Sequence, residues 1–299
     1  MQPASRNYQP SRPHATLPGM PGLFLRMLLS CLWVGMGAAS APGLRPAPAQ
    51  AQAQTAVDLE LVLAVDVSLS MDMEEQRLQR EGYVLALRDD EVHKAITSGP
   101  HGRIAVTYME WAGPPTQTVV IPWTIIDSPA SARAFAERLD NAPISRARMT
   151  SISAALQFSK DLLDASGVRG IRRVIDVSGD GPNNSGLPVT RIRDELIASG
   201  VVINGLPIVL KGPRPSGMFD LHDLDRYYAD CVIGGTGAFM IPVRELIEFK
   251  TATRRKLLLE ISGLEVPARL FPAQSSQTET SDCSVGERQW RRYMDGLPN

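Results

Sequence analysis

Apolar residues along the chain follow two spacings, one typical of buried strands and one typical of helices. Mainly apolar runs such as "LELVLAV" at 59–65, where Glu60 is the one charged residue, indicate strands that are buried on both faces. Longer stretches such as 150–166, where apolar residues return every three or four positions, indicate helices with one apolar face. The predicted strands are 59–65, 103–112, 117–126, 172–180, 201–210 and 238–243. The predicted helices are 72–89, 128–140, 150–166, 189–199, 224–232 and 244–262.

Strand and helix patterns alternate along most of the chain, and this order predicts the fold class. Such alternation favours an α/β fold with a doubly wound, mostly parallel sheet and helices on both faces. The exception is the pair of strands joined by "GPP" at 113–115, which predicts a hairpin and hence one antiparallel edge strand. The pattern predicts one domain over 57–263 and a polar C-terminal tail over 264–299.

The first 53 residues differ in composition from the rest of the chain. Arg6, Arg12 and Arg26 precede a short apolar segment at 27–40, and a stretch rich in Ala, Pro and Gln follows it. A basic start, a short apolar segment and small residues at alternate positions are typical of a secretory signal peptide, with cleavage predicted after Ala51 or Ala53. We therefore expect an exported protein, periplasmic or extracellular. An uncleaved membrane anchor is the alternative; no later apolar stretch is long enough to span a bilayer.

Charge and cysteine content narrow the class of protein further. The formal net charge is −1, so the sequence offers no electrostatic attraction to nucleic acid. Cys31 belongs to the N-terminal segment, which leaves Cys231 and Cys283 in the exported part. An oxidising compartment favours a disulfide between these two, which would tie the tail back to the domain. Two unrelated thiols are the alternative.

The first predicted strand runs directly into three small oxygen-bearing side chains at alternate positions. In "AVDVSLSMD" these are Asp66, Ser68 and Ser70. In an open parallel sheet, ligands bind at the carboxyl ends of the strands, which is where these residues lie. One carboxylate and two hydroxyls form a hard-oxygen set that suits Mg²⁺ or Mn²⁺, with Ca²⁺ as a further candidate. Asp72, just after this loop, is expected to cap the first helix.

Two more oxygen-bearing residues fall at comparable places. Thr150 stands at the start of a predicted helix, where a threonine is most often an N-cap. Asp180 ends another predicted strand, where an aspartate before Gly181 is commonly a turn residue. A doubly wound sheet would bring both to the edge that carries the first loop. The set of three loops therefore favours a metal site over the separate capping and turn roles.

The same loops carry a resemblance to a known family. D-x-S-x-S, a distant Thr and a strand ending in Asp-Gly resemble the metal-ion-dependent adhesion site (MIDAS) of von Willebrand factor A domains, in the same order over 57–263. The chain resembles more closely the DUF1194 family of secreted bacterial proteins. The segments that carry this resemblance are "AVDVSLSMD", "VIDVSGDGPNN", "YYADCVIGGTGAFMIPV" and "RRKLLLEISG".

The resemblance implies roles for the five residues. In the family pattern the positions of Ser68, Ser70 and Thr150 coordinate the metal directly, and those of Asp66 and Asp180 hold it directly or through water. The open coordination position takes an acidic group from a partner protein, so the resemblance implies a binding module and not an enzyme. A cation held mostly by neutral hydroxyls keeps much of its charge, which supports that mechanism.

Two features of the third loop leave questions open. Many A domains have Thr-Asp-Gly there, whereas this chain has "SGDG" at 178–181, and the extra Gly bears on how Asp180 is aimed. Asp176 also lies inside a strand that should be buried. It either orients a hydroxyl or water near the metal, or pairs with a buried basic residue.

Two other functions compete with a metal-dependent binding module. One is a scaffold with the same fold and no working metal site. The other is a hydrolase, but a nucleophilic serine needs a base, and His93, His101 and His222 lie in no recognisable catalytic motif. The sequence does not specify the partner protein, the oligomeric state of this chain or the choice of metal.

Overall fold

The computed structural model describes residues 54–210, 221–263 and 280–296 of the chain. The predicted signal peptide at 1–53 lies outside these residues, so its cleavage and the expected export stay predictions. Among the described residues, no helix combines the length and the apolar character needed to cross a membrane.

Five strands form one sheet in the order β3-β2-β1-β4-β5. β1 pairs in parallel with β2 and β4, β4 pairs in parallel with β5, and β2 pairs antiparallel with the edge strand β3. The predicted fold class, mostly parallel with one antiparallel edge strand, is confirmed. The strands are β1 (Thr55–Asp66), β2 (Ile104–Trp111), β3 (Gln117–Ile126), β4 (Val168–Gly179) and β5 (Val202–Pro207).

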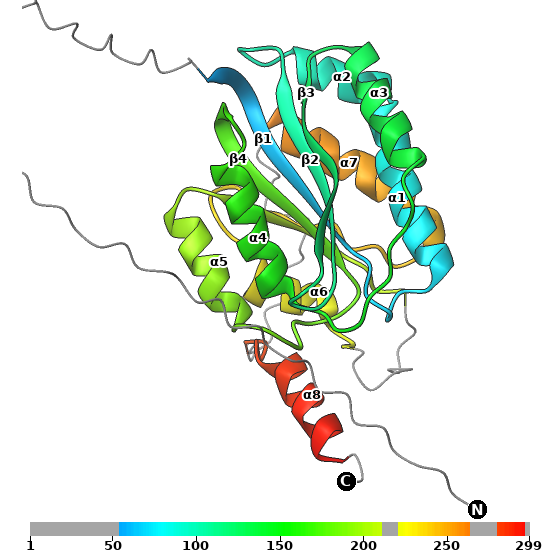
Figure 1. Cartoon of the computed structure of the whole chain (residues 1–299), viewed down its shortest axis with the longest axis vertical. Coiled ribbons are helices and arrows are strands. Elements are labelled where there is room, and N and C mark those ends of the chain that lie inside the picture. The colour runs from blue at the N-terminus through cyan, green and yellow to red at the C-terminus, as the bar shows by residue number, and fades with distance from the viewer. Residues whose placement is uncertain (1–53, 211–220, 264–279, 297–299) are drawn as a thin grey trace, which may run out of the picture. The chain divides into compact units, whose positions relative to one another are not determined.

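Helices cover both faces of this sheet (Figure 1). One face packs against α1, α2, α3 and α7, and the other packs against α4, α5 and α6. The central strand β1 is buried from Val57 to Asp66, which explains its mainly apolar run. The helices are α1 (Met73–Leu87), α2 (Asp90–Thr97), α3 (Pro129–Asp140), α4 (Ile152–Asp164), α5 (Val189–Ala198), α6 (Leu224–Tyr227), α7 (Phe249–Ser262) and α8 (Val285–Asp295).

Local start signals explain where two of these helices begin. The Asp72 carboxylate accepts from the backbone N–H groups of Glu74 and Glu75, as predicted for the cap of α1. At α3, Ser128 is the N-cap and Pro129 is the first helical residue, a position where proline needs no N–H partner.

The structure differs from several of the predicted elements. The α2 helix was not predicted, and α7 begins at Phe249 after a short 3₁₀ turn (Leu246–Glu248). The predicted strand 238–243 makes only isolated bridges near β5, and a π-helical turn (Tyr228–Val232) extends α6. Finally, α8 is a helix within the predicted polar tail.

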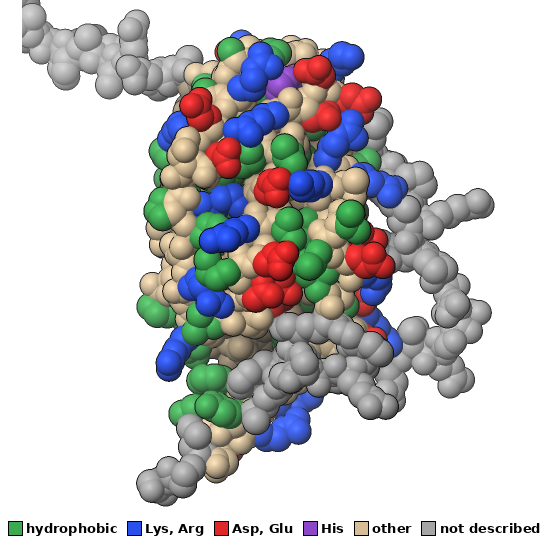
Figure 2. Space-filling view, turned by 90° about the vertical axis from the view of Figure 1, so that its right-hand side faces the viewer, with side chains coloured by type: hydrophobic (Ala, Val, Ile, Leu, Met, Phe, Trp, Pro, Cys, Tyr) green, Lys and Arg blue, Asp and Glu red, His purple; other side chains and the backbone are tan. Residues whose placement is uncertain are grey.

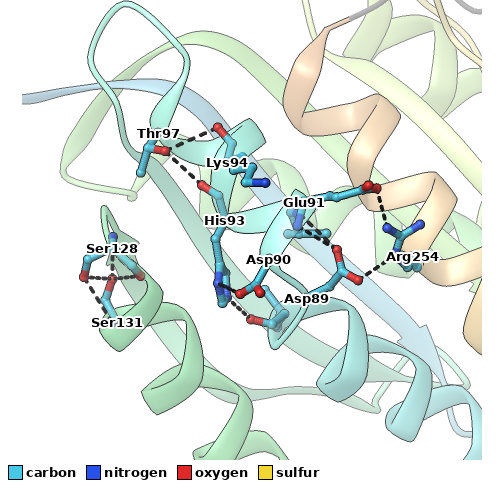
Figure 3. Close-up of polar contacts among 11 residues, drawn as sticks. Asp89, Asp90, Glu91, His93, Lys94, Thr97, Ser128, Ser131 and Arg254 are labelled. Carbon is cyan, nitrogen blue, oxygen red and sulfur yellow. Dashed lines mark hydrogen bonds and ion pairs between the residues drawn. The ribbon is translucent and has the colours of Figure 1, made fainter.

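Ion pairs hold α2 against α7, as Figure 3 shows. The Arg254 guanidinium of α7 donates to Asp89, the N-cap of α2, at 2.7 Å and to Glu91 at 2.5 Å. His93 lies in this cluster, where its Nε2 is 2.8 Å from the Leu87 carbonyl oxygen. Figure 2 shows acidic and basic side chains interspersed over the visible face, in agreement with the small net charge.

Candidate metal centre

The first loop turns sharply after β1. The Asp66 side chain is fully buried, and its Oδ1 accepts from the Ser68 backbone N–H at 2.7 Å. The two serine hydroxyls of the loop then face each other, with Ser68 Oγ 2.8 Å from Ser70 Oγ. Two backbone hydrogen bonds tie this loop to the second one: the Leu69 N–H donates to the Ala147 carbonyl at 2.9 Å, and the Ala147 N–H donates to the Val67 carbonyl at 3.1 Å. The alternate spacing in the sequence therefore places both hydroxyls on one side.

The second loop presents Thr150 without using it as a helix cap. Ser151 is the N-cap of α4, and its hydroxyl accepts from the Ala154 N–H at 3.3 Å. Met149, with φ +70°, is the only non-glycine residue of positive φ among those described, and it turns the chain just before Thr150. The capping role, which was the alternative for Thr150, thus belongs to its neighbour.

The third loop brings Asp180 to the first. Asp180 Oδ1 accepts from the Ser70 hydroxyl at 2.6 Å. Gly179 passes so close to the first loop that an added Cβ would lie 2.9 Å from Asp66 Oδ2 and 2.9 Å from the Tyr228 hydroxyl. The extra glycine of "SGDG" is therefore required by close packing, and Asp180 still reaches the first loop.

Hydrogen bonds also join the second and third loops. The Thr150 N–H donates to the Asn184 side-chain oxygen at 2.9 Å, and the Asn184 N–H donates to the Thr150 carbonyl at 2.9 Å. Asn183 is fully buried, and its Oδ1 accepts from the Ser153 N–H at 3.0 Å. The "GPNN" turn is therefore part of the framework of the site.

All three loops open onto one cavity of about 800 Å³ at the carboxyl end of the sheet. Four of the five predicted site residues line it, namely Ser68, Ser70, Thr150 and Asp180. The fifth, Asp66, lies buried directly beneath and contacts Ser68. The structure therefore brings together the whole predicted set.

The electrostatics of this set fit a cation. Burial, together with the nearby Asp180 carboxylate, raises the pKa of Asp66 well above its usual range. Asp66 Oδ2 is buried and has no hydrogen-bond partner among the described residues. Two close carboxylates and three hydroxyls form a hard-oxygen donor set of the kind that Mg²⁺ and Mn²⁺ prefer. In the part of the chain that the structure describes, no three His, Cys, Asp or Glu side chains form a metal cluster, so the hydroxyls are essential to this set.

Asp176 has a different role from the five site residues. Its Oδ1 lies 2.6 Å from Lys256 Nζ, and the same ammonium lies 2.5 Å from Glu260 Oε1. All three side chains are fully buried. Of the two interpretations left open by the sequence, pairing with a buried basic residue is the one that the structure shows.

A second buried ion pair supports the loop that carries Thr150. Arg80 of α1 pairs with Glu110 near the end of β2, and both side chains are almost fully buried. Glu110 Oε2 accepts from the Ser145 N–H at 3.3 Å, and the Arg80 guanidinium donates to the Ala142 carbonyl. These contacts anchor the segment before Thr150 on the sheet.

Sequence reasoning missed several residues that line the cavity. Arg148 and Met149 directly precede Thr150, and the sequence around them contains no motif that would have identified them. Trp290, Tyr293 and Met294 come from α8. Their spacing of three and four positions is a helical signal that could have been recognised inside the polar tail. The predicted Cys231–Cys283 disulfide, with a Cα–Cα distance of 5.5 Å, is confirmed and leads the chain to α8.

A parallel sheet with one antiparallel edge strand, covered on both faces and carrying three oxygen-rich loops at its carboxyl end, defines a von Willebrand factor A-like domain. The family model described as "Protein of unknown function (DUF1194)" matches residues 56–265. The chain belongs to this family, and the resemblance seen in the sequence is confirmed.

Solved structures with a similar fold come from distant proteins. Proximal thread matrix protein 1 from the mussel byssus is 13% identical with a TM-score of 0.50, and the match covers 69% of this chain and 48% of that one. The pilus adhesin SpaC from Lactobacillus rhamnosus GG is 12% identical with a TM-score of 0.52, covering 71% and 31%. The mussel protein is also described with a zinc-occupied MIDAS motif, at 12% identity, a TM-score of 0.48 and coverage of 70% and 49%.

This chain thus spans about half of the mussel protein and about a third of the adhesin. No curated protein matches it. At such low identity these likenesses concern the fold, and the function has to be argued from the site.

Proposed function

We propose that this domain is an exported binding module that holds a divalent cation, Mg²⁺ or Mn²⁺, and uses it to bind a carboxylate of a protein partner. Ser68, Ser70 and Thr150 would hold the ion through their hydroxyls, and Asp66 and Asp180 would hold it directly or through water. Ca²⁺ is a third candidate for the same oxygen set. The bound ion supplies an electrophilic coordination position for the partner's carboxylate.

One observation carries the proposal: the three loops meet in a single cavity, where the Ser70 hydroxyl is 2.6 Å from Asp180 and the buried Asp66 keeps an unpartnered oxygen among the described residues. A buried carboxylate oxygen without a partner costs stability. A cation held by these loops would offset that cost.

The donor set also supports a carboxylate as the ligand of the ion. Two aspartates match the charge of a divalent ion, and the three hydroxyls are neutral. With the ion bound, no net negative charge from this set opposes an incoming carboxylate, and Arg148 adds a positive charge at the cavity wall.

The two competing functions have less support. A hydrolase would need a base beside a serine, yet no histidine stands among the described residues that line the cavity. A metal-free scaffold would leave the Asp66 and Asp180 carboxylates close together in a buried position with no cation to offset their repulsion.

Calorimetric titration with Mg²⁺ and Mn²⁺ tests the proposal. We expect binding to the unmodified protein, and no binding to the double variant Asp66→Asn, Asp180→Asn, whose shape is retained while both charges are removed. Asp161→Asn, an exposed aspartate on α4, is the matched control and should bind as the unmodified protein does. Equal binding to the double variant would place the ion elsewhere, and no binding to any protein would favour the metal-free scaffold.

A further inference from the structure

The C-terminal helix α8 forms one wall of the cavity at the candidate metal site. Trp290, Tyr293 and Met294 line it from α8, and Ser68, Ser70 and Asp180 line it from the loops. In Figure 1, α8 lies at the end of the sheet where β1 finishes. None of the three α8 residues belongs to the proposed metal set, so the cavity is larger than a metal site requires.

Several contacts hold α8 in this place. The disulfide joins Cys283, just before the helix, to Cys231 in the core. The Ser281 N–H donates to Asp230 at 2.9 Å, and the Asn183 amide donates to Glu287 at 2.7 Å. An isolated helix of eleven residues is marginal in water, so the position of α8 depends on these links.

The first turn of α8 packs directly on the third metal loop. A Cβ added to Gly286 would lie 2.2 Å from the Asn183 carbonyl oxygen, so only glycine permits this approach. Asn183 is three residues from Asp180. Helix α8 therefore packs directly on the loop that carries the candidate ligand Asp180.

The wall is apolar and partly exposed. Tyr293 is 36% exposed and Met294 is 49% exposed, and Leu69, which also lines the cavity, is 47% exposed. The ring centroids of Trp290 and Tyr293 lie 5.6 Å apart, with an angle of 37° between the ring planes. Exposed apolar side chains gathered beside polar groups mark a binding surface.

The charge of the cavity with the ion bound favours partners that carry an acidic group. Asp66 and Asp180 together offset the charge of a divalent ion, and Arg148 then leaves the cavity with positive charge. A volume of about 800 Å³ lies within the range of ligand pockets and is larger than a single carboxylate group needs. A ligand that fills it would combine an acidic group with apolar bulk.

We propose that α8 makes this cavity a two-part site, in which the partner's Asp or Glu carboxylate binds at the metal loops while a large apolar side chain next to it packs against Trp290, Tyr293 and Met294. The proposal rests on the proposed function for the carboxylate half. The ligand is thus an acidic segment of a protein with an aromatic or large aliphatic neighbour.

Three short peptides test the two halves separately with the full chain in Mg²⁺. The probes are Ac-GFDFG-NH₂, Ac-GADAG-NH₂ and Ac-GFNFG-NH₂. We expect the first to bind about ten-fold more tightly than the second, because it buries at least one more large apolar side chain. The third lacks the carboxylate and should show no Mg²⁺-dependent binding.

Variants on α8 then assign the preference to the wall. Trp290→Ala with Met294→Ala should make the first two peptides bind equally, while the calorimetric affinity for Mg²⁺ stays unchanged. Arg291→Ala is the control, because this exposed residue of α8 does not line the cavity, and it should keep the ten-fold preference.

Each other outcome overturns the proposal. Equal binding of the first two peptides, or a preference that survives in the α8 double variant, would show that α8 does not select the ligand. Failure of both Asp peptides to bind while Mg²⁺ binds would show that the cavity is closed to such segments, for instance by another part of the same chain. Loss of Mg²⁺ binding itself would instead contradict the proposed function on which this inference rests.

Discussion

Thr150 and Ser151 are adjacent hydroxyl residues with separate roles at the start of α4. Ser151 caps the helix, and Thr150 faces the cavity between the other two loops. Position 179 likewise requires glycine, because a Cβ there would lie too close to the Asp66 carboxylate. At the scale of single residues, the site therefore depends on Ser151 capping the helix while Thr150 faces the cavity.

This division predicts opposite results for two alanine variants. Thr150→Ala should weaken Mg²⁺ binding in calorimetry and change the free energy of unfolding little, because no cap is lost. Ser151→Ala should lower the free energy of unfolding by about 1 kcal/mol, since the N-cap hydrogen bond to Ala154 is removed. Its Mg²⁺ affinity should stay close to normal. If Ser151→Ala bound Mg²⁺ more weakly and Thr150→Ala did not, Ser151 and not Thr150 would be the metal ligand.

A single charge change tests the repulsion between the two aspartates. In chelator, Asp180→Asn should unfold at a higher temperature than the unmodified protein, because it removes a like charge beside the buried Asp66. A gain of about 1 kcal/mol corresponds to roughly 2–4 °C for a domain of this size. Added Mg²⁺ should then raise the midpoint of the unmodified protein and not that of the variant. A lower midpoint without metal would show that the aspartates do not repel.

At the scale of elements, a buried charge cluster joins α7 to the sheet. Lys256 of α7 contacts Asp176 of β4 and Glu260 one turn along α7, and the Asn204 amide of β5 donates to Glu260 at 3.0 Å. One buried ammonium faces two buried carboxylates. Burial and the neighbouring Asp176 raise the pKa of Glu260 to about 7, and burial raises the pKa of Asp176 as well. The position of α7 is thus coupled to the protonation of this cluster.

Removing the ammonium should destabilise the fold strongly. Lys256→Met keeps the volume and leaves two buried carboxylates without a cation, which should lower the free energy of unfolding by about 3–5 kcal/mol at pH 8. The loss should be smaller at pH 5, where the carboxylates can take up protons. Lys250→Met, which breaks the exposed pair with Glu81, is the control and should cost less than about 1 kcal/mol. Urea unfolding measures both, and similar losses would contradict a buried cluster.

The same cluster predicts how stability depends on pH. Glu260 has an ordinary pKa of 4.5, and in the folded protein its pKa is about 7, so between these values the folded state binds more protons. The stabilisation is therefore fully present below pH 4.5 and is lost as the pH rises through 7. Asp176, whose pKa is also raised, adds a loss of the same sign.

Glu260→Gln should flatten this dependence. The groups that face Glu260 are Lys256, Asp176, Asn204, Tyr83 and Arg172, and all of them stay in place. Urea unfolding at pH 5 and pH 8 should show a smaller decrease for this variant than for the unmodified protein. Glu195→Gln, an exposed carboxylate paired with Arg191, is the control and should leave the slope unchanged. Equal slopes in all three proteins would contradict the raised pKa.

At the scale of the whole molecule, the Cys231–Cys283 bridge decides where the C-terminal segment lies. Cys231 is fully buried in the core and Cys283 precedes α8, so the bridge brings the helix to the cavity. Only Gly286 is buried within α8 itself. The helix contributes little to the core and much to the shape of the site.

Breaking the bridge should therefore release α8 and leave the domain folded. In Cys283→Ser we expect hydrogen exchange of the α8 amides to become at least about ten-fold faster, because the helix is marginal without its tether. The free energy of unfolding of the domain should fall by about 2–4 kcal/mol, because the bridge restricts the unfolded chain over a sequence separation of 52 residues, while the sheet and its core remain intact. Ser284→Ala, beside the bridge, is the control. Unchanged exchange in Cys283→Ser would show that packing alone holds the helix.

Much of the fold could be predicted because its signals are local. The buried run of β1, the Asp72 cap and the Ser128-Pro129 helix start are each encoded within a few residues. The predicted strand 238–243 failed as a regular strand because its pairing depends on distant partners, and it makes only bridges to Gly205 and Ile208. The α2 helix was missed because its eight residues carry a short pattern.

The sequence by itself determined the α/β class and the meeting of the three loops, because the carboxyl ends of parallel strands lie at one edge of a sheet. Only the tertiary structure decided that Ser151 caps α4 in place of Thr150, that Asp176 faces Lys256, and that α8 forms a wall of the cavity. The last two depend on contacts between residues far apart in the chain, and the first depends on a one-residue difference in where the helix begins. None of these three features leaves a pattern that a short stretch of sequence can show.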